Sequence, residues 1–188
     1  MRQGVHAVPA LPVLMRNLAI IVAGVVIMTA AAKTQVPFYP VPMTLHTAAV
    51  MAFALALSPR MSVAVFVAYL AAGAVGLPVF AGTPGRGIGL AYMMGPTGGY
   101  LAGYLFASGL VAALAAGRGT VGRLGAMLLG LAIVYACGVI WLAQFVSVNQ
   151  VFTLGVAPFV LGDLLKIALV AAGASAVTAF GPWARTPH

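Results

Sequence analysis

Two residues of opposite charge, Asp163 and Lys166, lie in the apolar segment PFVLGDLLK, which begins at Pro158. Asp163 is the only acidic residue of the chain. Residues three apart on a helix share one face, so this carboxylate and this ammonium can pair with each other or face one ligand. An ionised side chain at the centre of a membrane costs about 2.5–3.5 kcal/mol, so both must face protein, water or each other. The pair either only holds one helix in position, or it forms part of a binding site. We favour the binding site.

A proline-rich segment, residues 36–46, is the second region with unusual chemistry. Prolines at positions 37, 40 and 42 favour an extended loop, and Pro42 suits the first turn of a following helix. The pattern predicts that Thr44 and His46 lie near the outer mouth of that helix. A rigid turn followed by a merely polar helix start is the alternative.

The third region with unusual chemistry is a glycine-rich segment, residues 76–100, which contains Arg86 and Tyr92. Glycine permits positive φ and close backbone approach, so this segment can fold over a cavity. It does not fit a phosphate-binding loop, because no strand pattern precedes Gly85-Arg86-Gly87 and no Lys-Ser/Thr pair follows it. A flexible connection between two helices is the alternative interpretation.

Together the three segments predict a mixed polar and apolar site at the outer end of one helix bundle. Such a site suits a small organic anion with an apolar body, held by cations, while Asp163 accepts hydrogen bonds from N–H groups of the ligand. We expect no metal, because Cys137 is the single cysteine and no Cys/His spacing suggests ligands. The candidate site residues are Asp163, Lys166, Arg86, Thr44, His46 and Tyr92.

The composition decides which elements position these residues. Hydrophobic residues make up 63% of the 188 residues and charged residues only 5%, which is too few to cover a soluble domain. We therefore predict an all-α integral membrane protein with one domain over residues 1–188. A bilayer needs about 20 helical residues per span, and the uncharged runs predict six transmembrane helices near residues 17–32, 43–57, 61–77, 98–116, 124–145 and 158–180.

The cations predict the orientation of these spans. Six spans put both termini on one side, together with Arg2, Arg16, Arg60, Arg118, Arg123 and Arg185, while Lys33 and Arg86 face the other side. The positive-inside rule then places both termini in the cytoplasm. Although the formal net charge is +8, the cations are scattered, so nucleic acid is not an expected partner. Cleavage of the first helix as a signal peptide after Ala30-Ala31-Ala32 is the less favoured alternative.

Small residues on the first helix predict a second kind of contact. Ala19 and Ala23 lie four apart, a spacing that lets another helix approach closely. Such pairs also recur by chance in an alanine-rich chain, so spacing alone makes this a weak candidate for a docking site.

Four motifs in order along the chain, PVPMTLHT, GLPVFAG, MGPTGGY and PFVLGDLLK, resemble the BioY family, the biotin-binding membrane subunits of energy-coupling-factor (ECF) transporters. The resemblance implies a six-helix substrate-capture fold in the bacterial cytoplasmic (inner) membrane, with biotin bound near the outer face. It implies a transmembrane coupling subunit and two ATPase subunits as partners. It assigns the family's Asp-x-x-Lys motif to Asp163 and Lys166, and its docking motif to Ala19 and Ala23. Whether Lys166 or Arg86 holds the biotin carboxylate stays open.

Three other functions remain as alternatives. A subunit of the same fold could capture another vitamin, and an ion-coupled carrier of small anions could use the Asp163 carboxylate, although no internal repeat supports a carrier. A membrane enzyme such as an acyl or prenyl transferase would need Asp163 and His46 in contact. The chain has no nucleotide-binding motif, so ATP hydrolysis would belong to partners and no cofactor is expected.

Overall fold

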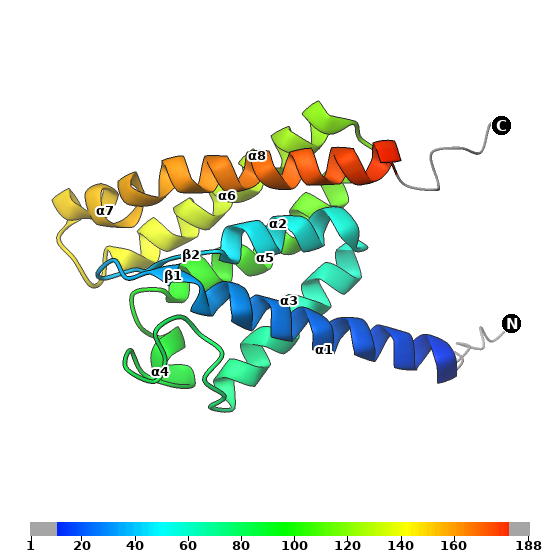
Figure 1. The fold of residues 1–188 in the computed structure, drawn as a ribbon. Helices are drawn as coiled ribbons and strands as arrows, with labels where there is room; N and C mark the ends of the chain where they lie inside the picture. Colours follow the sequence, from blue (N-terminus) through cyan, green and yellow to red (C-terminus); the bar gives the residue numbers. More distant parts are fainter. Residues whose placement is uncertain (1–10, 181–188) are drawn as a thin grey trace, which may run out of the picture.

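The structure is a computed structural model that describes residues 11–180 (Figure 1). In this range the chain is mostly helical, with one small antiparallel sheet. The elements are α1 (Leu11–Lys33), β1 (Gln35–Val36), β2 (Met43–Thr44), α2 (His46–Ala56), α3 (Pro59–Ala74), α4 (Leu90–Met93), α5 (Gly98–Ala115), α6 (Thr120–Leu142), α7 (Val148–Gly155) and α8 (Ala157–Phe180).

Long apolar helices dominate the described part of the chain, as the composition predicts. Four helical segments, Leu11–Lys33, Gly98–Ala115, Thr120–Leu142 and Val148–Val177, are long and apolar enough to cross a membrane. Two shorter helices, α2 and α3, are also apolar. The chain is therefore a multi-pass membrane protein, while the number of six spans stays a prediction.

The second helix begins later than the sequence predicts. We expected it over 43–57, but Met43 and Thr44 form β2, which pairs with Gln35 and Val36 of β1. The Leu45 N–H then donates to the carbonyls of Ala31 and Thr34. Proline at position 42 has no N–H, and the backbone groups of Met43 and Thr44 pair with β1, so the helix starts only at His46.

Two short helices were absent from the sequence prediction. Helix α4 interrupts the glycine-rich segment, and α7 precedes α8 with a break at Val156. Pro158 has no N–H for helical pairing, so α7 and α8 cannot continue as one regular helix at this point. The remaining predicted helices are observed with ends shifted by a few residues, except that α1 extends back to Leu11.

Glycine permits the most extensive helix contact among the described residues, between α5 and α6. A Cβ added at Gly103 would lie 2.7 Å from the Cα of Val134, and one at Gly138 would collide with the ring of Tyr100. The two backbones therefore approach as closely as they do because these positions lack side chains. This pair of helices forms the framework against which α2, α3 and α8 pack.

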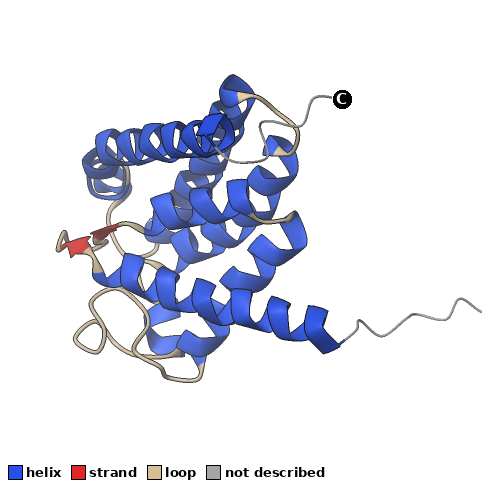
Figure 2. Ribbon diagram, turned by 45° about the vertical axis from the view of Figure 1, so that its right-hand side comes forward, coloured by secondary structure: helices blue, strands red, loops and turns tan. Residues whose placement is uncertain are grey.

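The two ends of the bundle differ in their elements and their charges. The start of α1, the end of α8 and the α2–α3 and α5–α6 connections lie at one end, and the hairpin and the α3–α5 connection lie at the other (Figures 1 and 2). Arg16, Arg60, Arg118 and Arg123 belong to the first end and Lys33 to the second, as predicted from the sequence. Arg2 and Arg185 lie outside the described residues. The cytoplasmic position of the first end stays a prediction.

Candidate ligand-binding site

A cavity lies at the end of the bundle that carries the hairpin. It contains about 500 Å³ of empty space, its opening included. Five of the candidate residues line it: Asp163, Lys166, Thr44, His46 and Tyr92. The wall is completed by aromatic and apolar side chains from α5, α6 and α8, among them Tyr100, Tyr104, Tyr135 and Phe159.

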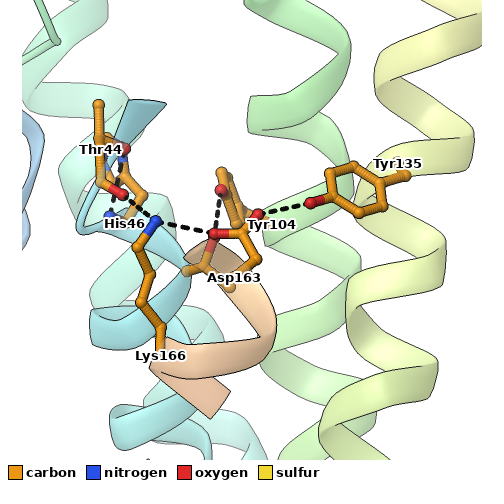
Figure 3. Close-up of polar contacts among 7 residues, drawn as sticks. Thr44, His46, Tyr104, Tyr135, Asp163 and Lys166 are labelled. Atoms are coloured by element: carbon orange, nitrogen blue, oxygen red, sulfur yellow. Dashed lines mark hydrogen bonds and ion pairs between the residues drawn. The ribbon is translucent and has the colours of Figure 1, made fainter. Parts of the chain in front are cut away.

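The Asp163–Lys166 pair forms one side of this cavity, and Figure 3 shows Asp163 between Lys166 and Tyr135. Lys166 Nζ lies 2.8 Å from Asp163 Oδ1, and the Tyr135 hydroxyl donates to Asp163 Oδ2 at 2.7 Å. Asp163 is only 4% exposed. A buried carboxylate needs such partners, because an unpaired charge away from water is strongly disfavoured.

The pair retains capacity for a ligand. The ammonium of Lys166 has three N–H donors, of which one reaches Asp163 and one donates to the Thr44 carbonyl at 2.7 Å. Each carboxylate oxygen of Asp163 has two lone pairs and accepts one of the hydrogen bonds described above. One donor of Lys166 and further acceptor positions on Asp163 are therefore left to meet a ligand with both N–H and carbonyl groups.

His46 is held by hydrogen bonds on both sides of its ring. Its Nδ1 lies 3.2 Å from Thr44 Oγ1, and its Nε2 lies 2.9 Å from the Tyr69 hydroxyl. Tyr69 donates to the Val79 carbonyl at 3.3 Å, so Nε2–H of His46 is the donor to Tyr69. His46 is thus a fixed part of the wall, and its Nδ1 is paired with Thr44.

Three tyrosines of the site were missed by the sequence analysis. Tyr135 binds Asp163 directly, Tyr104 bonds to Thr47 Oγ1 at 2.8 Å, and Tyr100 donates to the Gly155 carbonyl at 2.8 Å. Tyr100 and Tyr104 lie four apart on α5 and so share one face, which is a signal that the sequence offers. No comparable pattern marks Tyr135, which is an isolated tyrosine on an apolar helix.

Tyr92 lies where the cavity meets the loops. Its ring stacks on Phe80, with centroids 4.8 Å apart and planes 13° apart. Burial raises the pKa of the Tyr92 phenol, so the side chain stays a neutral hydroxyl. Tyr92 and Thr97 line both the cavity and a second hollow further out, so these two residues separate the two spaces.

Arg86 lies in that outer hollow and does not line the cavity that holds the other five candidates. Its guanidinium donates to the carbonyls of Pro40 at 2.8 Å and Phe38 at 2.6 Å. It thereby ties the glycine-rich segment to the proline-rich loop. Lys33 makes a similar link, since its Nζ donates to the Phe80 carbonyl at 3.0 Å and to Thr83 Oγ1 at 2.8 Å.

Ala19 and Ala23 lie far from the cavity along α1. Both are exposed, whereas Gly24 and Met28 of the same helix are buried, with Gly24 against Val65 of α3. The alanines therefore face away from the bundle. This placement leaves them accessible to another helix, and their docking role stays a prediction.

Comparison with known proteins gives the family. The sequence matches the BioY family over residues 2–182. The chain belongs to the BioY family. It is 38% identical over 153 residues to the "Probable biotin transporter BioY" of Pyrococcus horikoshii, which covers 81% of this chain and 90% of that protein. It is 34% identical over 139 residues to the "Biotin transporter BioY" of Thermotoga maritima, which covers 73% of this chain and 80% of that one.

The fold is also that of a solved structure. A crystal structure of "the S-component for biotin from an ECF-type ABC transporter" superposes with a TM-score of 0.77. The match covers 93% of this chain and 96% of that chain, at 23% sequence identity. The chain therefore has the fold of this S-component.

The geometry offers little to a metal ion or a hydrolytic triad. Within residues 11–180 no group of three or more His, Cys, Asp and Glu side chains could hold a metal. The ring nitrogens of His46 bond to Thr44 and Tyr69, and both oxygens of Asp163 bond to Lys166 and Tyr135. These bonds do not include a contact between Asp163 and His46, which a membrane enzyme would need. The relatives are named transporters.

The pair makes a testable contribution to stability. We expect Lys166→Met to lower the free energy of unfolding by about 1–3 kcal/mol, because it leaves the buried Asp163 carboxylate with Tyr135 alone. The double variant Asp163→Asn/Lys166→Met should lose less than the sum of the two single variants. Thermal unfolding of ligand-free protein in detergent measures this, with the exposed Arg60→Met as the control. Additive losses would show that the two side chains do not stabilise each other.

Proposed function

We propose that this chain captures biotin at the outer face of the cytoplasmic membrane, as the substrate-binding subunit of an ECF-type transporter. The observation that carries the proposal is the buried Asp163–Lys166 pair, which lines a largely apolar cavity in a chain of the BioY family. Biotin has a ureido ring with two N–H donors and one carbonyl, and an aliphatic tail that ends in a carboxylate. Each of these groups has a complementary partner among the described residues.

The ureido ring fits the inner side of the cavity. Asp163 can accept from the ring N–H groups with the lone pairs that Lys166 and Tyr135 leave open, and the remaining N–H of Lys166 can donate to the ring carbonyl. The aliphatic tail would then pack against the aromatic wall of Tyr100, Tyr104 and Phe159. Buried polar groups that match a ligand in this way give stronger discrimination than apolar contacts alone.

The carboxylate of the tail fits Arg86 better than Lys166. Lys166 is already neutralised by Asp163, the only acid of the chain. Arg86 faces only the neutral carbonyls of Phe38 and Pro40, so its charge has no carboxylate partner. The outer hollow that Arg86 lines adjoins the cavity at Tyr92 and Thr97, which gives the tail a direction in which to extend. We assign the carboxylate to Arg86 on these grounds.

Transport would require partners that this chain lacks. We propose that a transmembrane coupling subunit docks on the face of α1 that carries Ala19 and Ala23, and that two ATPase subunits in the cytoplasm supply the energy. Both alanines are exposed on the side of α1 opposite its buried residues Gly24 and Met28. Small residues permit the close helix approach that such an interface requires.

Equilibrium binding of biotin to the purified protein tests the proposal directly. We expect nanomolar affinity, about −12 kcal/mol, for biotin and no binding of thiamine. Asp163→Ala should weaken biotin binding by about 100-fold or more, because it removes two charge-assisted acceptors. Binding of another vitamin alone would reassign the substrate. Unchanged affinity in Asp163→Ala would remove this residue from the site, and an ion gradient that drives uptake by the isolated chain would favour a carrier.

The assignment of the carboxylate has its own test. Biotin methyl ester should bind about tenfold or more weakly than biotin to the unmodified protein, because the ester carries no charge for Arg86. In Arg86→Gln this difference should nearly disappear. Lys33→Gln is the matched control, since it also removes a cation that ties the loops but lines neither space. If Arg86→Gln keeps the full difference and a Lys166 variant removes it, Lys166 holds the carboxylate.

The docking face is tested by added bulk. We expect Ala19→Leu/Ala23→Leu to abolish ATP-driven uptake by the assembled transporter while biotin affinity of the isolated chain stays unchanged, because α1 does not line the cavity. Ala168→Leu/Ala172→Leu on α8 is the matched control, since these alanines are also exposed and four apart. Equal uptake by the α1 variant and the unmodified transporter would show that the coupling subunit binds elsewhere.

A further inference from the structure

Apart from the cavity and the outer hollow at Arg86, a third space lies at the opposite end of the bundle. It is a groove of about 740 Å³, its opening included, and the residues that line it belong to α2, α6 and α8. The same three helices contribute Thr47, Tyr135 and Asp163 to the cavity at their other ends. The lining residues of the groove are Ala52, Leu55, Ala56, Arg123, Val170, Gly173, Ala174 and Val177.

The groove is apolar except for one charge at α6. Among the described residues that line it, Arg123 is the only polar one, and the others are glycine or small or branched aliphatic residues. Gly173 makes the groove deeper, because a Cβ added there would meet nothing within 4 Å. The shape and chemistry suit a long aliphatic chain that ends in an anionic group.

Arg123 has no acidic side chain as a partner in the part of the chain that the structure describes. The only carboxylate side chain, Asp163, is held by Lys166 and Tyr135 at the other end of α8. Across residues 11–177 the structure gives the guanidinium of Arg123 no hydrogen bond or ion pair, although this residue is half-buried. Arginine binds phosphate through its planar fork of donors, so a phosphate group would complement this position.

We propose that this groove binds one anionic glycerophospholipid, with an acyl chain along α2 and α8 and its phosphate on Arg123. A lipid combines the two features that the groove requires, and it surrounds a multi-pass membrane protein at high concentration. Basic positions between membrane helices on the cytoplasmic side are favourable sites for anionic headgroups, and the positive charge at this end of the bundle fits that side. The site is independent of biotin binding and of the partner subunits.

The charge of the headgroup gives the first test. Purified protein, stripped of lipid in detergent, is titrated with phosphatidylglycerol or phosphatidylcholine, and the bound lipids are counted by native mass spectrometry. We expect one phosphatidylglycerol to bind more tightly than phosphatidylcholine. Arg123→Gln should weaken phosphatidylglycerol about fivefold, the effect of one cation near an anionic headgroup. Arg118→Gln removes the same charge from the nearby α5–α6 connection outside the groove, and it should change nothing.

The apolar part of the groove gives the second test. Gly173→Leu should fill the groove and abolish the tight lipid, while Gly125→Leu should keep it, because Gly125 also has open space at its Cβ but is not among the residues that line this groove. Biotin affinity reports whether each variant is folded, since the cavity is at the other end. If Gly173→Leu does not fold, the Arg123→Gln comparison alone still decides.

Three results would overturn the proposal. Equal binding of the two lipids, unaffected by either groove variant, would show ordinary solvation by the bilayer. If a groove variant loses the co-purified coupling subunit but binds lipid as before, the groove is a subunit interface. A dimer that dissociates in Gly173→Leu at unchanged lipid binding would make it a contact between two copies of this chain.

Discussion

The pairing of one buried carboxylate with one ammonium determines how charge is distributed in the whole molecule. Asp163 is the only acidic side chain among ten charged residues, nine of which are cations, and its carboxylate is already paired with Lys166 and Tyr135. Every other cation must therefore find a neutral carbonyl, water or an anion from outside the chain. Arg86 and Lys33 use loop carbonyls, whereas the half-buried Arg123 faces an apolar groove. The anions proposed above, a substrate carboxylate and a lipid phosphate, follow from this imbalance.

The loops at the outer end depend on those cations for their position. The Pro37–Pro42 region has few N–H groups to form regular structure, so its carbonyls remain as acceptors. Arg86 binds two of them, and the short β1–β2 pairing fixes the base of the loop. The Thr44 carbonyl, at the end of the same hairpin, accepts from Lys166. The loop and the ion pair of α8 are thus joined directly, and the cavity forms between them.

The sequence analysis predicted correctly those features of the fold and site that depend on local composition and residue spacing. Apolar runs gave the helical membrane fold, and the three-residue spacing predicted that Asp163 and Lys166 share a face. The predicted start of α2 was wrong because residues 43–44 pair with residues 35–36 in a hairpin, and this pairing competes with the helix. Arg86 could not be placed because its position depends on how two loops fold against each other. Tyr135 was missed because only the packing of α6 against α8 brings it to Asp163.

Specificity in such a cavity arises more from unmatched polar groups than from the total number of contacts. Without ligand, Asp163, Lys166, Tyr135 and Thr44 already satisfy one another, so a ligand gains only the remaining hydrogen bonds and the burial of its apolar surface. A molecule of similar shape without N–H donors would shield Asp163 from water and give it nothing in return. A molecule without a carboxylate would leave Arg86 with only its carbonyl partners. With Arg86 as the proposed carboxylate partner, the two spaces together would select for one ligand that carries both groups at the correct separation.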